Sequence, residues 1–163
     1  MLQLQPMTQD NYNKYIDCAI QKYAEEGVQS GDLEFEKSLQ LATKQFNELL
    51  PDGLNSENQY LNTIINDENE KIGIMWFSTK SRHGDNEAFL YDIEINKEYR
   101  SRGYGRESMK LLESRVKDYN LASISLHVFL HNEIACKLYN KIGYEEVIRG
   151  NGGIIMRKFL QKL

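Results

Sequence analysis

The stretch that decides the fold of this chain reads Glu98-Tyr99-Arg100-Ser101-Arg102-Gly103-Tyr104-Gly105-Arg106. It joins a predicted strand over residues 88–95 to a predicted helix that starts at Gly103 and ends near Tyr119. A further predicted strand over residues 124–129 follows this helix. Strand, helix and strand make a βαβ unit, so the two strands should lie parallel.

The connection between strand and helix is suited to an anion. Unpaired amide N–H groups converge at the N-terminus of a helix, and Gly103 and Gly105 let the backbone approach a diphosphate with no Cβ in the way. Arg100, Arg102 and Arg106 add charge-assisted donors around the same point. For an isolated two-glycine loop, however, a plain structural turn would be the better interpretation.

Two nucleotide-binding patterns compete for this loop. A dinucleotide fold expects Gly-x-Gly-x-x-Gly and an acidic residue about 20 positions later. Here Ser108 replaces the third glycine, and the next strand ends in His127-Val128-Phe129. The Gly-Lys-Ser/Thr ending of a nucleoside-triphosphate loop is absent as well, so both patterns are disfavoured.

A second group of residues follows in a predicted helix over residues 133–142. Asn132, Ala135 and Tyr139 stand at i, i+3 and i+7 and therefore share one helix face. The small alanine between two polar side chains leaves a shallow groove. Taken alone, Tyr139 is more typical of a packing aromatic with a satisfied hydroxyl.

Together, Arg100-x-x-Gly103-x-Gly105 and Asn132-x-x-Ala135-x-x-Leu138-Tyr139-x-Lys141-x-Gly143-Tyr144 resemble the GNAT superfamily of acyl-CoA N-acyltransferases. The likeness covers residues 88–144 most strongly, and the segments before them resemble uncharacterised bacterial acetyltransferases. The resemblance implies an α/β fold in one domain, residues 1–163. Its central sheet would be mixed and mostly antiparallel, with six to seven strands, about four helices, and a splayed parallel strand pair around the acyl-CoA site.

The resemblance also implies roles for individual residues, with acetyl-CoA as co-substrate. Backbone amides of the glycine loop would bind the pyrophosphate, Arg100 would frame that loop, and Asn132 would bond the pantetheine arm. Tyr139 would protonate the departing thiolate. The implied coenzyme-binding residues are Ile95, Arg100, Ser101, Arg102, Gly103, Tyr104, Gly105, Arg106, Asn132, Ala135 and Tyr139.

The acceptor amine must lose a proton before it attacks, because an alkylamine with a pKa of about 10.4 is mostly protonated at neutral pH. We take Glu94 or Asp92 as the base, directly or through a water. These acids should share one strand face, with Tyr91, Ile93 and Ile95 on the other. A solvated strand face is the alternative. His127 is a further titratable candidate; its spacing to His131 makes no metal site, and no metal is expected.

The chain before this unit predicts a helix over residues 9–26, closed by Gly27, and a second helix over residues 35–49. A hairpin over residues 60–65 and 72–77 follows, and two short strands over residues 145–149 and 154–159 end the chain. The connection between the first two helices carries acids, which are Glu25, Glu26, Asp32, Glu34 and Glu36.

Charge is unevenly divided along the 163 residues. Residues 1–99 hold eight basic and eighteen acidic side chains, and residues 100–163 hold twelve and six. A positive half suits a phosphate ligand and a negative half a cationic one, although the two halves could simply attract each other. Scattered basic residues disfavour nucleic-acid binding. In the resembled family the acidic connection borders the acceptor pocket, which favours a cationic amine.

Several broader expectations follow from composition. The N-terminus has neither the pattern of a secretory signal nor a membrane span behind it, so a cytoplasmic protein without membrane contact is expected. Cys18 and Cys136 are interpreted as buried packing residues without a disulfide. The resemblance also implies a possible homodimer through the C-terminal strands.

An acyl-CoA sensor without turnover is the alternative function, and a nicotinamide oxidoreductase is disfavoured. The acceptor could be a small metabolite, polyamine, antibiotic, peptide N-terminus or protein lysine.

Overall fold

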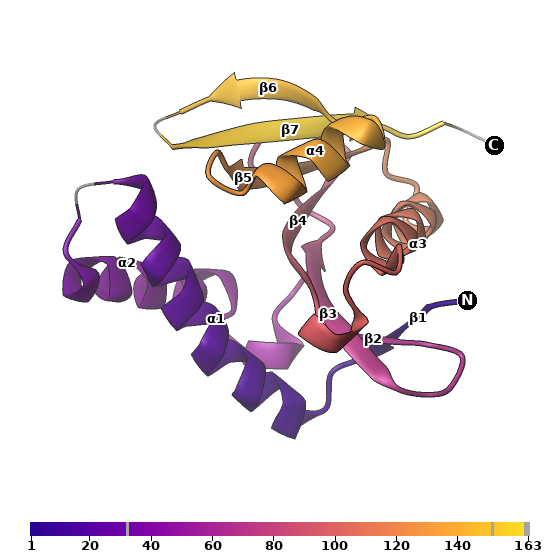
Figure 1. Cartoon of the computed structure of the whole chain (residues 1–163), viewed down its shortest axis with the longest axis horizontal. Helices are drawn as coiled ribbons and strands as arrows, with labels where there is room; N and C mark the ends of the chain where they lie inside the picture. Colours follow the sequence, from indigo (N-terminus) through magenta and orange to yellow (C-terminus); the bar gives the residue numbers. More distant parts are fainter. Residues whose placement is uncertain (32, 151, 162–163) are drawn as a thin grey trace.

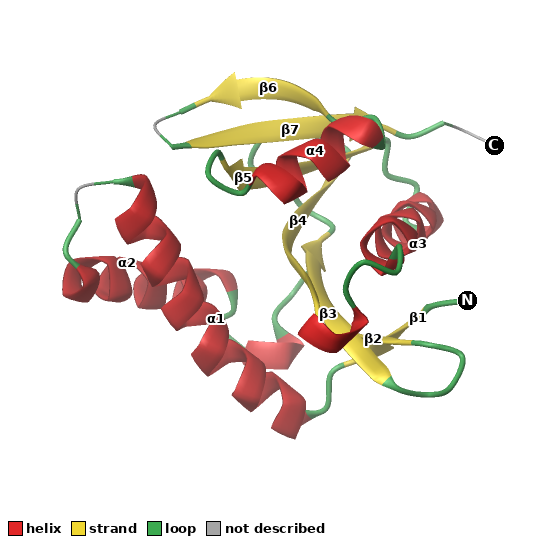
Figure 2. Ribbon diagram, viewed as in Figure 1, coloured by secondary structure: helices red, strands yellow, loops and turns green. Residues whose placement is uncertain are grey.

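A computed structural model describes residues 1–31, 33–150 and 152–161 of the chain. Its centre is a seven-stranded sheet in the order β1-β2-β3-β4-β5-β7-β6, in which every neighbouring pair is antiparallel except β4 and β5 (Figure 2). The predicted mixed, mostly antiparallel sheet with one parallel pair is therefore confirmed. The strands are β1 (Gln3–Pro6), β2 (Gln59–Ile65), β3 (Lys71–Ser78), β4 (Glu87–Ile95), β5 (Ser123–Phe129), β6 (Glu145–Arg149) and β7 (Gly153–Phe159).

Four α-helices accompany the sheet within the described residues, and they are α1 (Gln9–Ser30), α2 (Phe35–Leu49), α3 (Tyr104–Asp118) and α4 (Glu133–Lys141). The predicted end of the first helix at Gly27 is wrong, because α1 continues to Ser30. A Cβ on Gly27 would lie 2.7 Å from Oγ of Ser38 in α2. This glycine therefore allows α1 and α2 to approach closely and does not end the helix. None of the helices in these described ranges is long and apolar enough to cross a membrane.

The two faces of the sheet have separate hydrophobic cores. Helices α1 and α2 lie on one side of β3 and β4, and α3 lies on the other (Figure 1). Phe46 of α2 packs with Leu61 and Trp76 on the first face. The second core contains the buried α3 side chains Met109 and Leu112, and also Tyr139 of α4 (8% exposed) with residues of β4, β5 and β7. Burial of these apolar faces positions all four helices around β4.

The parallel pair is joined at one end only. Its pairing runs from Glu87 opposite Ser123 to Leu90 opposite Leu126, and there the ladder stops. Strand β4 nevertheless continues to Ile95 and β5 continues to Phe129. The two strands therefore splay, as the resemblance implied. Beyond Leu90, the backbone N–H and C=O groups of β4 that face the gap do not pair with β5.

A buried carboxylate lies at the joined end of the pair. Glu87 is 1% exposed and receives hydrogen bonds from the Ser123 and Ser125 hydroxyls of β5 at 2.9 and 3.0 Å. Arg157 of β7 binds it through Nε and Nη2, and Ser81 of the β3–β4 loop donates to it at 2.8 Å. The Glu87 carboxylate of β4 thus binds side chains from β5, β7 and the β3–β4 loop. These contacts fix the paired end of β4 and β5, beyond which the two strands separate.

Two further features differ from the sequence analysis. Residues 3–6 were not predicted to form a strand, but they form β1, which pairs with β2 at the edge of the sheet. Its four residues end at Pro6 and bury only Leu4, so the periodic signal is weak. Cys18 is exposed and Cys136 is partly buried, so the expectation of a buried Cys18 is wrong. Asp32 of the acidic connection lies outside the described residues.

Candidate active site

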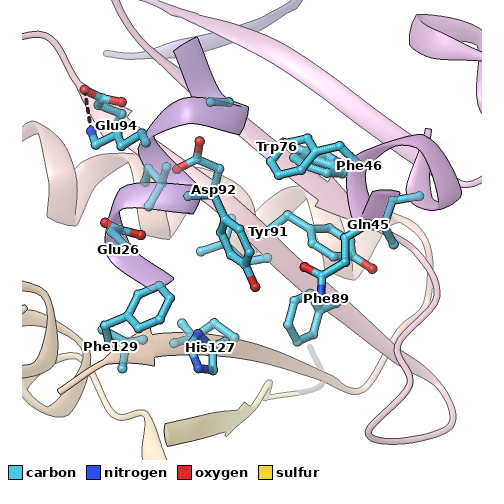
Figure 3. A pocket seen from close by; sticks show the side chains of 18 of the residues that line it. Glu26, Gln45, Phe46, Trp76, Phe89, Tyr91, Asp92, Glu94, His127 and Phe129 are labelled. Carbon is cyan, nitrogen blue, oxygen red and sulfur yellow. Dashed lines mark ion pairs between the residues drawn. The ribbon is translucent and has the colours of Figure 1, made fainter. Parts of the chain in front are cut away.

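A cavity of about 510 Å³ opens where β4 and β5 separate. Its walls come from α1, α2, β3, β4, the β3–β4 loop, β5 and α4, so the cavity connects both sides of the strand gap. Asn132, Ala135 and Tyr139 all line it, which confirms that they share one helix face. Asp92, Glu94 and His127 line it as well, and Figure 3 shows Glu26, Asp92 and Glu94 on its left and Phe46, Trp76 and Gln45 on its right.

The two acids proposed as bases have different surroundings. The Asp92 carboxylate accepts a 2.6 Å hydrogen bond from the hydroxyl of Tyr15 in α1. Burial raises the pKa of Asp92, and the nearby Glu94 adds to this, although the Tyr15 hydrogen bond acts the opposite way. Glu94 instead forms ion pairs with Lys22 Nζ at 3.0 Å and Arg100 Nη2 at 3.6 Å. Asp92 therefore has a pKa above that of an ordinary aspartate, and Glu94 is held in ion pairs.

The predicted separation of faces in β4 is correct for Ile93 and Ile95 but wrong for Tyr91. Pairing with β3 shifts by one residue, since Trp76 stands opposite Asp92 while Phe77 stands opposite Leu90. Tyr91 is the extra residue of this bulge, and its ring stacks on Trp76 with 4.5 Å between centroids. A bulge turns two successive side chains to one side, so Tyr91 and Asp92 both face the cavity.

Tyr139 lies in the second core, and its side chain reaches the cavity. Its ring centroid is 5.8 Å from that of Tyr144. Burial raises the pKa of Tyr139 well above its ordinary value, and the charge of Asp92 adds to this effect. The hydroxyl therefore stays protonated at neutral pH and can act as a donor.

The glycine loop forms the N-terminus of α3. Gly103 is the N-cap residue with φ of 81°, and no side chain caps the helix there. Ser101 is also left-handed, with φ of 62°. Arg100 holds the loop to the end of β4, because its Nε donates to the Ile95 carbonyl at 2.8 Å. The N-cap residue thus gives the first amides of α3 no side-chain acceptor, and the short 3-10 helix Lys97–Tyr99 and the loop connect them to the strand that borders the cavity.

The remaining loop residues predicted to bind the coenzyme lie around this helix start. Arg102 is placed over the Tyr99 ring, with 5.5 Å from its Cζ to the ring centroid. Tyr104, Gly105 and Arg106 form the first turn of α3. Arg106 is exposed. A Cβ added to Gly105 would lie 3.6 Å from Leu138 Cδ2 of α4, which is an ordinary van der Waals contact. The loop residues lie beside the cavity, and they do not form its walls.

Asn132 has a structural contact in addition to its position in the cavity wall. Its Oδ1 accepts a hydrogen bond from the Ala135 amide at 3.3 Å and so caps α4. The amide Nδ2 of the same side chain is a donor that such a cap does not use. Capping therefore orients Asn132 and leaves a polar group for a ligand.

Sequence reasoning missed several residues that line the cavity. From α1 these include Tyr15, Ala19, Lys22 and Glu26, whose spacing of four, three and four residues places them on one helix face, with Cys18 and Tyr23 beside them. That spacing was the available signal, but Glu26 was counted only as part of an acidic connection. Burial raises the pKa of Glu26. Among the described residues, no group of three or more His, Cys, Asp and Glu side chains could hold a metal ion.

Comparison with known proteins agrees with this geometry. Residues 20–144 match the model of the acetyltransferase (GNAT) family, and the chain belongs to that family. It is 32% identical to the uncharacterized N-acetyltransferase YycN of Bacillus subtilis over 89% of this chain and 93% of the relative. YdgE of the same organism is 28% identical over 86% and 90%.

Solved structures show the same fold. The crystal structure of YycN from Bacillus subtilis superposes with a TM-score of 0.86, covering 92% of this chain and 96% of that one at 31% identity. The PaiA N-acetyltransferase of Thermoplasma acidophilum in complex with coenzyme A has a TM-score of 0.67 at 16% identity, covering 98% and 99%. The protein is thus an acetyltransferase with the GNAT fold.

Proposed function

We propose that the protein transfers the acetyl group of acetyl-CoA to a primary amine by direct attack in a ternary complex. The observation that carries this proposal is the end of β4–β5 pairing at Leu90 and Leu126, which opens a cavity holding Asp92 and Tyr139. An extended pantetheine arm could pair with the unladdered edge of β4. PaiA, which has the same fold, was solved with coenzyme A, and this supports the same ligand here.

The pyrophosphate of the coenzyme would bind at the start of α3. Gly103 leaves the first amides of the helix uncapped, and a helix N-terminus carries a partial positive charge. Arg102 and Arg106 would add cations beside it. Arg100, bonded to the Ile95 carbonyl, would hold the loop at a constant distance from β4.

Asp92 is our choice for the base that takes the amine proton. A carboxylate whose pKa is raised is a stronger base at neutral pH than an ordinary one. Glu94 is occupied by Lys22 and Arg100, so its part in the reaction would be indirect, through the charge that it adds near Asp92. The ammonium would first lose one proton to Asp92, and the neutral nitrogen would then attack the thioester carbonyl, forming the C–N bond; the second proton that the nitrogen loses balances the proton delivered to the departing sulfur.

Collapse of the tetrahedral intermediate breaks the C–S bond and releases a thiolate. Tyr139 would donate a hydrogen bond, and finally its proton, to this sulfur. Because burial raises the pKa of Tyr139, complete proton transfer to a thiolate whose conjugate thiol has a pKa of about 8.5 is uphill. Tyr139 would therefore assist departure mainly as a hydrogen-bond donor. The backbone amide of Ile95 is our candidate for the oxyanion contact.

The proposal is tested by binding and turnover with purified protein. Calorimetry should detect coenzyme A and not NAD, and acetyl-CoA should release thiol in the presence of a primary amine. The variant Arg106→Glu should weaken coenzyme A binding by at least about tenfold, since it places a negative charge at the helix N-terminus.

Arg115→Glu is the matched control for this charge reversal, because Arg115 lies in the last turn of the same helix. Its coenzyme A affinity should remain close to that of the parent protein. Absence of coenzyme A binding at millimolar concentration would refute the proposed function.

A further inference from the structure

Several aromatic rings from five different elements line the cavity. Each ring contacts the next along the cavity wall. We call this set the aromatic belt, and in the order of contact it consists of Phe129, Tyr23, Phe46, Trp76, Tyr91 and Phe89.

Distances between ring centroids show that the belt is continuous. They are 6.1 Å from Phe129 to Tyr23, 5.9 Å from Tyr23 to Phe46 and 5.5 Å from Phe46 to Trp76. The Trp76–Tyr91 and Tyr91–Phe89 distances are 4.5 and 4.7 Å. All lie in the range of favourable aromatic contacts. Tyr23, Phe89, Tyr91 and Phe129 are only partly buried and can contact a ligand, whereas Phe46 and Trp76 (2% exposed) support them from the core.

One histidine ring lies beside each end of the belt. His83 lies 5.6 Å from Phe89, and His127 lies 4.8 Å from Phe129, measured between ring centroids. The belt takes its rings from two helices and three strands, so it is not confined to one wall of the cavity.

The charges of the cavity are arranged unequally around these rings. Glu26 and Asp92 both line the cavity and lie to the left of Phe46 and Trp76 in Figure 3, with Asp92 opposite Trp76 in the β3–β4 pairing. Glu94 on the same side is paired with Lys22. An ammonium group is therefore directed to Glu26 and Asp92, within the same cavity as Tyr139.

Arg82 and Glu48, which both line the cavity, together offer a second cation no net attraction. Arg82 of the β3–β4 loop lines the cavity, and its charge is felt at the Tyr91 hydroxyl, where it opposes the effect of burial on the pKa. A second ammonium extending past Tyr91 would be repelled by this guanidinium. Glu48 of α2 also lines the cavity and would partly offset the repulsion. The surroundings thus favour an acceptor with one positive end and an uncharged body.

We infer that the acceptor is an arylalkylamine, a primary amine on a short chain that ends in an aromatic ring. Its ammonium would bind between Glu26 and Asp92, and its ring would pack within the aromatic belt. This inference rests on the proposed acetyl transfer and names the substrate class for the same site. A polyamine, which has several charges and no ring, is the competing class.

The test compares amines of matched charge or length in the thiol-release assay. We expect kcat/KM for 2-phenylethylamine to exceed the values for n-hexylamine and spermidine by at least about tenfold, from ring stacking and desolvation. Phe89→Leu should reduce the preference for 2-phenylethylamine over n-hexylamine by at least about threefold. Phe159→Leu is the control, because Phe159 is 74% exposed and lies outside the cavity, and it should leave the preference unchanged.

Binding can be followed separately from turnover because Trp76 is the single tryptophan of the chain and belongs to the belt. Trp76 is excited at a wavelength that a phenyl ring does not absorb, with coenzyme A present. Added 2-phenylethylamine should then change the Trp76 emission in a saturable way, and spermidine should leave the emission unchanged. Faster acetylation of spermidine, or a preference that Phe89→Leu leaves intact, would overturn the inference while acetyl transfer stands. Failure to bind coenzyme A would refute acetyl transfer itself. In that case the amine site is judged by Trp76 emission alone, and an emission unchanged at millimolar 2-phenylethylamine would overturn the inference.

Discussion

Replacement of Gly73 by alanine tests how strictly the end of β4 must be positioned. Gly73 is buried in β3 and stands opposite Ile95 in β4. An added Cβ would lie 2.2 Å from the Glu94 carbonyl oxygen and 3.2 Å from the Ile95 Cα. Both contacts are with backbone, so no side-chain rotation can relieve them, and β4 itself must move.

The required movement follows from these distances. A carbon atom approaches a carbonyl oxygen to about 3.3 Å, so the end of β4 must retreat by about 1 Å from the 2.2 Å contact. Overpacking of this kind costs about 1–3 kcal/mol, which lowers Tm by roughly 2–12 °C for a chain of this size. A misplacement of about 1 Å can reduce turnover by about 100-fold, because Asp92 and the Ile95 amide move with the strand.

Two measurements on Gly73→Ala check this reasoning, namely thermal unfolding followed by circular dichroism and kcat/KM in the thiol-release assay. Gly150→Ala is the matched control, since a Cβ there would meet its nearest neighbour, the Gly153 carbonyl oxygen, at 3.8 Å. It should unfold and react like the parent protein. Parent-like activity and Tm in Gly73→Ala would refute the claim that backbone contact between β3 and β4 sets the site.

Three further substitutions address individual groups. Tyr139→Phe should lower kcat at least about tenfold, equivalent to about 1.4 kcal/mol, and calorimetry should find coenzyme A affinity nearly unchanged; a parent-like kcat would remove Tyr139 from the mechanism. Asp92→Asn keeps an acceptor for Tyr15 and should lower kcat/KM by about 10²–10⁴-fold without loss of Tm; in the parent, the rate should fall as pH drops through the raised pKa of Asp92, and survival of that acidic limb in the variant would contradict its role as base. Glu87→Gln leaves Arg157 (17% exposed) without its carboxylate and should cost about 3 kcal/mol, or roughly 6–12 °C in Tm, at neutral pH. Burial alone would raise the pKa of Glu87, but hydrogen bonds from Arg157 and three serines lower it, so this stabilisation is present above the unfolded pKa of about 4.3 and is lost as pH falls through the folded pKa; an equal Tm deficit at neutral pH and below pH 4 would contradict this linkage.

Local signals explain the parts of the fold that were predicted correctly. The βαβ unit around Gly103 and the face shared by Asn132 and Tyr139 depend on spacings within a few residues, and the structure confirms both. The same spacing rule, applied to Lys22 and Glu26 in α1, would have added them to the candidate site. The end of α1 was misplaced because Gly27 has a tertiary role, contact with Ser38, that resembles a helix stop in the sequence.

The sequence by itself determined the family, the loop proposed to bind a pyrophosphate, and the strand that carries the two acids, since each of these is a pattern of neighbouring residues. Only the tertiary structure decided what distinguishes those acids. Tyr15 donates to Asp92, while Lys22 pairs with Glu94, and the bulge at Tyr91 turns its ring toward Trp76. These contacts join elements distant in the chain, and their energy depends on burial and orientation that no local period records. For the same physical reason, the aromatic belt exists only once five separate elements have packed around one cavity.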